Sequence, residues 1–214
     1  MKTSILICCL LTVALGFMGC APLTYQVQVN GYTDLTAPGV IAPGGTFFVM
    51  ENKEAKNPLL DKEIKDKIVK LLESQGYGAA ALDKAQYLLF FGYGMGGGRS
   101  VTVVFPDYYP GWWYPGYPRS YFFASPFVGY YPYSETLYDK WLLVKVVDAK
   151  AYRDKGEFKS LWVGEARSTG TSADLRVVIN YLLRAVFEQF GKNTGKAVTV
   201  DISESDPVIR EWTK

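Results

Sequence analysis

Residues 175–190, LRVVINYLLRAVFEQF, form the stretch of the 214-residue chain that decides the fold. Apolar residues recur there at spacings of three and four, which predicts a helix with one apolar face. They are Leu175, Val178, Ile179, Leu182, Leu183, Val186, Phe187 and Phe190. Thr171 and Asp174 resemble a capping box before this helix, and Gly191 is a typical terminator after it. Such a helix needs an apolar wall to pack against, so a sheet is expected beside it.

A second amphipathic helix is predicted in the first half of the chain. Asn57 followed by Pro58 is typical of an N-cap and a first helical residue, and Gly76 marks the end of the helix. Between them the apolar positions are Leu60, Ile64, Ile68, Leu71 and Leu72. The opposite side of this helix is rich in lysine and acidic residues, which we interpret as solvated surface.

Strands are predicted around the two helices from short apolar or alternating runs. The runs are 24–30, 46–50, 87–91, 101–105, 137–148, 161–167 and 196–202. Both faces of 137–148 are largely apolar, which predicts that both are covered. A hairpin turn at Lys155 and Gly156 is expected to join this strand to 161–167. We interpret the glycine-rich run 92–98 as a flexible turn or a bulge, because a phosphate loop would be followed by a helix.

The order of these elements predicts an α+β fold with two layers. We expect a mostly antiparallel sheet of about five or six strands, with both amphipathic helices packed on one face. A single domain is expected over residues 24–205, followed by a C-terminal tail at 206–214.

The first nineteen residues are typical of a bacterial signal peptide. Lys2 precedes the apolar segment 5–15, which has the length of a signal core. Gly19 before Cys20 resembles the lipobox at which bacterial lipoproteins are cleaved and lipidated, with palmitate among the acyl groups. This predicts a signal peptide at 1–19 and lipid attachment at Cys20. The alternatives are an uncleaved anchor and an ordinary secretory signal.

The predicted tether, residues 20–23, is short. Three or four extended residues span only ~10–14 Å, so the domain is expected to lie close to the membrane. By resemblance to proteobacterial sorting rules, Ala21 after the lipidated cysteine implies the outer membrane, with the domain facing the periplasm or the cell surface.

Composition excludes several classes of chemistry. The chain has no histidine, and its three cysteines, Cys8, Cys9 and Cys20, all lie in the first twenty residues. Histidine-based triads, His or Cys metal sites and disulfides of the mature chain are therefore excluded, and neither a metal nor a cofactor is expected. A net charge of +2 gives no basic footprint for nucleic acid.

Two carboxylate pairs are the remaining candidates for catalysis of the glycosidase type. They are Asp148 with Glu165, expected on adjacent strands, and Glu204 with Asp206 near the C-terminus. Nothing beyond spacing supports either pair. We therefore expect no enzymatic activity and rank a carboxylate-based hydrolase third among the functions.

Several of these features together resemble a known family. They are Asn57-Pro58-Leu59 at the first helix, VVDA at 146–149, LWVG at 161–164 and the amphipathic helix that follows. With the lipobox they look like the domain of unknown function 4136 family of bacterial envelope lipoproteins, over roughly residues 25–190. The resemblance implies an α+β fold and an envelope location. It implies no activity, so no functional residue is carried over.

An aromatic insert, with bounds set at 106–136, departs from the family's usual plan, as does the extra strand after Gly191. Residues 107–133 hold thirteen aromatic residues, five prolines and three glycines, and we expect these prolines and glycines to break regular structure. Tyrosine and tryptophan supply rigid contacts at interfaces. The candidate partner contacts are Trp112, Trp113, Tyr114, Tyr117, Tyr121, Tyr130 and Tyr131.

The role of the insert is open between four interpretations. It is a lid over the second face of 137–148, against Trp141, Leu143 and Val147, or a contact surface for another envelope protein. The other two are contact with the lipid surface and stacking on a glycan. The sequence thus predicts a lipid-anchored, non-catalytic structural or partner-binding protein of the outer membrane. The alternative is a glycan- or membrane-surface-binding module.

Overall fold

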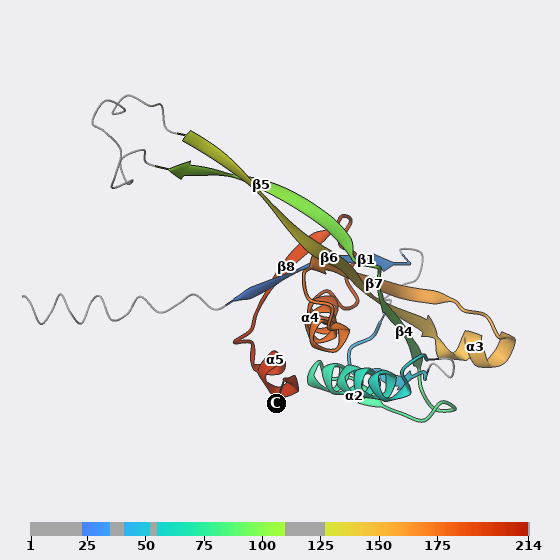
Figure 1. Ribbon diagram of the computed structural model, residues 1–214. Helices are drawn as coiled ribbons and strands as arrows, with labels where there is room; N and C mark the ends of the chain where they lie inside the picture. The colour runs from blue at the N-terminus through green and yellow to red at the C-terminus, as the bar shows by residue number, and fades with distance from the viewer. Residues whose placement is uncertain (1–22, 35–40, 52–54, 110–126, 214) are drawn as a thin grey trace, which may run out of the picture.

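The computed structural model describes residues 23–34, 41–51, 55–109 and 127–213 (Figure 1). The elements follow in the order β1 (Thr24–Thr33), β2 (Thr46–Val49), α2 (Pro58–Ser74), β3 (Gly78–Ala79), β4 (Tyr87–Met95), β5 (Arg99–Tyr109), β6 (Phe127–Asp148), α3 (Ala149–Lys155), β7 (Ser160–Gly170), α4 (Leu175–Glu188), β8 (Val198–Ser203) and α5 (Pro207–Trp212).

The strands form one open sheet in the order β3-β2-β4-β6-β7-β1-β8, and β5 pairs with the remaining part of β6. β2 runs parallel to β3 and β4, and the other pairs are antiparallel. The expectation of a mixed fold of helices and sheet is confirmed. The predicted numbers were wrong, because the described part of the chain has eight strands and four helices.

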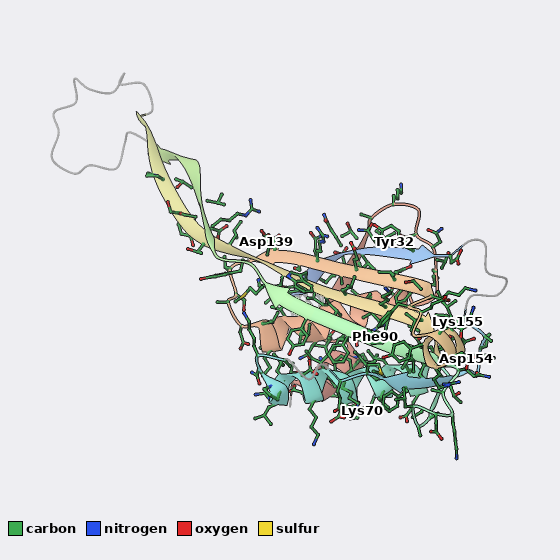
Figure 2. The ribbon with its side chains drawn as sticks, turned by 90° about the vertical axis from the view of Figure 1, so that its right-hand side faces the viewer. Tyr32, Lys70, Phe90, Asp139, Asp154 and Lys155 are labelled. Atoms are coloured by element: carbon green, nitrogen blue, oxygen red, sulfur yellow. The ribbon has the colours of Figure 1, made fainter. Side chains whose placement is uncertain are left out.

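The two long helices, α2 and α4, lie on one side of the sheet (Figure 2). Among the described residues, only α3 and a small cluster beside it cover part of the other side, which we call the open face. Between α4 and the sheet, Trp162 is 1% exposed, and its Nε1 donates a hydrogen bond to the Lys192 carbonyl at 3.0 Å. Gly164 lies two residues further along β7. A Cβ atom there would be 2.2 Å from the Trp162 ring and 2.7 Å from Val186 Cγ2. Only a residue without a side chain therefore lets α4 pack against β7 at this point.

Both predicted helices are present, and one predicted cap was wrong. The Asn57 side chain caps α2 as expected, accepting a hydrogen bond from Leu60 N at 3.1 Å. The N-cap of α4 is Asp174 rather than Thr171, because the Asp174 carboxylate accepts directly from Arg176 N at 2.9 Å and also from the following amide.

The predicted hairpin turn between β6 and β7 was also wrong, since this segment contains helix α3. The Asp148 carboxylate caps α3 by accepting from Lys150 N at 2.8 Å, and Gly156 ends the helix with a φ of 69°. Asp206 caps α5 in the same way, within the segment that we predicted to be a tail. Helices of six or seven residues are too short to give a periodic sequence pattern.

The glycine-rich run is a bulge within one long hairpin. β4 and β5 pair one after the other with the same 22-residue strand, β6, so that Met95 lies opposite Lys140 and Arg99 opposite Leu137. Between these pairs, residues 96–98 face only 138–139, which is the residue imbalance of a β-bulge. The predicted strand 137–148 is thus the inner half of a longer one.

The outer half of this hairpin, Arg99–Tyr109 paired with Phe127–Leu137, projects beyond the sheet as a two-stranded ribbon that we call the arm (Figures 1 and 2). The expectation that the prolines of 107–133 break regular structure was wrong at the C-terminal end of the insert, where Pro132 lies within β6. Pro106 also lies within a strand, and a ribbon tolerates both prolines because, among the described strands, each of its two strands has one edge without a partner. Residues 110–126 lie outside the described residues.

A buried lysine joins three helices. Lys67 on α2 is 7% exposed, and its Nζ donates to Glu63 Oε1 and to Asn180 Oδ1 on α4, both at 2.7 Å. The same Nζ lies 5.4 Å from the ring centroid of Trp212 on α5. Glu63 also pairs with Arg176 at 3.1 Å. The hydrogen bond from Lys67 is the main cause that lowers the pKa of Glu63, against an opposing effect of burial.

Replacing Lys67 with alanine is expected to lower the free energy of unfolding by about 2–3 kcal/mol, because Asn180 loses its buried partner. Chemical denaturation measures this loss. Lys70→Ala is the matched control: Lys70 lies on the same helix in an exposed pair with Glu211, so its loss should stay below about 0.5 kcal/mol. Similar small losses in both variants would contradict the role of the buried lysine.

Candidate functional site

The open face of the sheet carries a row of residues from five adjacent strands. Thr199 on β8, Gln28 on β1, Arg167 on β7, Trp141 on β6 and Gly94 on β4 are successive neighbours in register. Alternate residues of a strand point to the same face. The row therefore brings together side chains that are far apart in the sequence, on the face that α2 and α4 leave uncovered.

A groove of about 550 Å³ runs along this row. Its lining includes Gln28, Trp141, Leu143, Glu165, Arg167 and Thr169. A second hollow of about 240 Å³ shares Gln28, Arg167 and Thr169 and extends to Thr199 on β8. The groove thus spans β6, β7, β1 and β8, and its lining mixes one indole ring with amide, carboxylate, hydroxyl and guanidinium groups.

Trp141 has the largest side chain in the groove lining. Its side chain is left 43% exposed, and its ring lies against the backbone of β4 at Gly94. A Cβ atom at Gly94 would be 2.7 Å from two ring atoms of Trp141, so only glycine fits under the indole. Large, rigid aromatic side chains of this kind are enriched at binding sites, where they supply contact area at low entropic cost.

The charges around the groove balance. Arg167 Nη2 lies 3.5 Å from Glu165 Oε2, and Arg99 Nε lies 3.8 Å from Asp139 Oδ2 at the base of the arm. Figure 2 shows Asp139 at that junction, where its Oδ1 accepts a hydrogen bond from Thr169 Oγ1 at 2.6 Å. These side chains therefore give the groove no strong field of either sign.

Lys140 is adjacent to Trp141 in sequence but belongs to the opposite face. It is 1% exposed, and its Nζ donates to the Gly170 carbonyl at 3.1 Å. Burial lowers the pKa of Lys140, and the nearby Asp139 carboxylate opposes that effect.

The prediction that both faces of 137–148 are covered holds for part of the strand. Val147 is fully buried in a small second cluster with Ala85, Leu88 and Ala149 on the open face. Trp141 and the half-buried Leu143 are not covered to that extent by the residues that the structure describes. A lid formed by the insert stays a prediction, because 110–126 lie outside those residues.

The first carboxylate pair is spread along the sheet, and one member of the second pair is used in structural contacts. Asp148 pairs with Tyr87 and Glu165 with Leu143, so the two acids are separated by five positions along β6, or roughly 16 Å. The expectation that strand pairing brings them together was wrong. Asp206 caps α5 and also accepts from Arg184 Nε at 3.2 Å, so its carboxylate is occupied in structural contacts.

The predicted site residues fall into two groups. Gly19 and Cys20 lie outside the described residues, as do Trp112, Trp113, Tyr114, Tyr117 and Tyr121. Tyr130 and Tyr131 lie on β6 in the arm, in register with Pro106 and Phe105. Sequence reasoning missed Gln28 and Arg167, because polar residues that alternate along a strand look like ordinary solvated positions.

The described ranges contain neither a metal-binding cluster nor a membrane-spanning helix. No group of three or more His, Cys, Asp or Glu residues there could hold a metal ion. No helix within those ranges is long and apolar enough to cross a membrane.

Comparison with known proteins identifies a family but no activity. The model of DUF4136, a domain of unknown function, matches residues 28–190. The curated proteins include no match to the chain.

Solved structures with a related arrangement include three from bacteria. A PDZ domain protein from Parabacteroides distasonis is 14% identical with a TM-score of 0.48, and covers 85% of this chain and 40% of its own. A DUF4136 family protein from Bacteroides thetaiotaomicron is 19% identical with a TM-score of 0.36, over 75% of this chain and 91% of its own. The PelC dodecamer from Paraburkholderia phytofirmans is 12% identical with a TM-score of 0.38, and the match covers 80% of this chain and 100% of the PelC chain. This chain thus spans less than half of the Parabacteroides protein.

Proposed function

The chain belongs to the DUF4136 family, and from that premise we propose that it is a lipid-anchored protein of the bacterial envelope that binds a partner and does not catalyse a reaction. The observation that supports binding is the groove on the open sheet face, in which the indole of Trp141 is 43% exposed. The two long helices, α2 and α4, cover the other face, so among the described residues the groove lies on the sheet face that they leave free for contact.

The proposed anchor is the acylated Cys20, with the outer membrane as its location and the domain facing the periplasm or the cell surface. The sequence 1–20 supports this, because a short apolar core is followed by Gly19 and Cys20. β1 begins at Thr24, immediately after the predicted tether. A domain held so close to the bilayer meets partners that lie in or beside the same membrane.

The proposed partner is another envelope protein. Trp141 and Arg167 are the residue types that most often dominate protein interfaces, and polar residues surround them here as at an interface rim. We retain the aromatic residues of the insert, Trp112, Trp113, Tyr114, Tyr117 and Tyr121, as proposed additional contacts.

A glycan is the second candidate ligand, and the make-up of the groove favours it specifically. A sugar ring presents C–H groups that can lie on an indole, and hydroxyl groups that pair with planar amide, carboxylate and guanidinium groups. Trp141 supplies the first kind of surface, and Gln28, Glu165 and Arg167 supply the second. The balanced charge of the groove suits a neutral glycan.

Replacing Trp141 with alanine is expected to reduce partner binding at least about tenfold, as for a central interface tryptophan. The test places a photoreactive residue at Gln28 in the groove and measures crosslinking in intact cells. Val177→Ala is the matched control, because Val177 is 45% exposed but lies on α4, on the opposite side of the sheet.

The two candidates give different products. A protein partner yields a crosslinked species that protease removes, whereas a cell-wall glycan yields one that muramidase removes. Unchanged crosslinking in Trp141→Ala, with circular dichroism showing a folded protein, would exclude the groove as the binding surface.

A further inference from the structure

The arm and the proposed lipid tether leave the domain at the same end of the sheet. β1 begins at Thr24, and Gln28 on β1 pairs with Arg167 on β7, so Thr24 is level with the end of β7. Gly170, at that end, pairs with Tyr138 at the base of the arm. Two strand spacings, roughly 10 Å, therefore separate the start of β1 from the base of the arm. Figure 1 shows both at one end of the sheet.

The arm is much longer than the tether. From Leu137 to the outermost pair, Tyr109 with Phe127, it extends over ten residues, or roughly 33 Å. The three Cα-to-Cα steps from Cys20 to Leu23 span at most ~11 Å. The distance from this end of the sheet to a bilayer that holds Cys20 is thus shorter than the length of the arm.

The outer arm, residues 102–109 paired with 127–134, is built mostly from apolar and aromatic residues. Register places Val103 opposite Tyr133 and Phe105 opposite Tyr131, and the alternate pairs are Val104 with Pro132, Pro106 with Tyr130 and Tyr108 with Val128. Within 101–109 and 127–134 the only charged residue is Asp107. Among the strands that the structure describes, β5 pairs only with β6. A two-stranded ribbon of this composition is marginal in water unless something covers it.

We propose that the arm lies in the lipid bilayer interface beside Cys20 and so fixes the orientation of the domain on the membrane. The inference rests on the lipid anchor proposed above. The tether holds the bilayer within reach of the arm, which raises its effective concentration far above that of a soluble partner. Tyrosine prefers the depth of the lipid headgroups, and the aliphatic residues of the arm suit the layer beneath them. The outer arm has no lysine or arginine, so contact depends on apolar burial and not on anionic lipid.

A fluorescent probe on the arm tests this contact. The mature lipoprotein has no free thiol, because Cys8 and Cys9 leave with the signal and Cys20 carries the lipid, so one introduced cysteine can be labelled selectively. Tyr108→Cys places an environment-sensitive probe on the arm, and Thr199→Cys places the control probe on β8. Each lipidated protein is reconstituted into vesicles of phosphatidylethanolamine and phosphatidylglycerol and isolated by flotation.

The arm probe is expected to brighten several-fold, shift to the blue and be quenched by spin-labelled lipid, while the control probe keeps its emission in water. Replacing phosphatidylglycerol with phosphatidylcholine should leave both signals unchanged. Val104→Cys, on the same strand, repeats the measurement if Tyr108→Cys does not fold.

Three results would overturn the proposal, and they are distinguishable. Protein that floats with vesicles but keeps a water-like arm probe is anchored by its lipid and does not use the arm. Protein that does not float lacks the anchor, and the proposed envelope attachment fails with it. An arm probe that is shielded without vesicles, increasingly so as protein concentration rises, shows that a second copy of the chain covers the arm instead of the bilayer.

Discussion

Replacing Gly164 with valine is expected to destabilise the domain by about 4 kcal/mol, a large part of the stability of an ordinary domain. Even a Cβ atom at this position would lie 2.2 Å from the Trp162 ring and 2.7 Å from Val186 on α4. Trp162 cannot easily move aside, because it is fully buried, its Nε1 is bonded to the Lys192 carbonyl and its ring packs on Phe190 with centroids 4.9 Å apart. The helix and the sheet would have to separate.

Urea unfolding followed by circular dichroism measures the effect, and the near-ultraviolet signal reports on the buried tryptophan. Gly97→Val is the matched control. Gly97 lies in the bulge with no atom near its Cβ position and no positive φ, so the expected change is within about 0.5 kcal/mol. A Gly164→Val protein that unfolds at the same urea concentration as the natural chain would show that α4 does not pack on β7 as described.

The parts of the fold that could be predicted from sequence are the elements whose own residues show an apolar period or a cap. α4 and α2 each have an apolar stripe long enough to be periodic, and Asn57 with Pro58 marks the start of α2. α5 has the same start signal in Asp206 and Pro207. It was missed because six residues do not complete a second turn, so no periodicity accompanies the cap.

The groove could not be predicted because it depends on register between distant strands. Trp141 was expected on the second face of its strand, and it lies there. Its neighbours Arg167 and Gln28 come from β7 and β1, and only the pairing of those strands with β6 brings the three together. Gly94 is informative for the same reason. Its lack of a side chain is a packing requirement only once Trp141 is known to lie over it.

Replacing Cys20 with alanine is expected to abolish palmitate incorporation and release the protein from the membrane fraction. Each buried CH₂ of an acyl chain contributes ~0.8 kcal/mol, so the acyl groups of a lipoprotein dominate its membrane affinity. Interfacial contact by the arm is weaker than acylation and should leave only a small, reversible membrane-bound fraction. Radiolabelled palmitate and fractionation of cell envelopes measure the two effects separately.

The double variant Cys8→Ala, Cys9→Ala is the control for this experiment, since both residues precede the predicted cleavage site and neither is the predicted lipid attachment site. It should keep both the label and the membrane location. Palmitate incorporation that persists in Cys20→Ala would contradict lipid attachment at this residue. Retention in the membrane without label, at the mass of the uncleaved chain, would instead show that residues 1–19 remain as the anchor. In that case residues 20–23 would not be a lipidated N-terminus, and the proposed position of the bilayer beside Cys20 would be wrong.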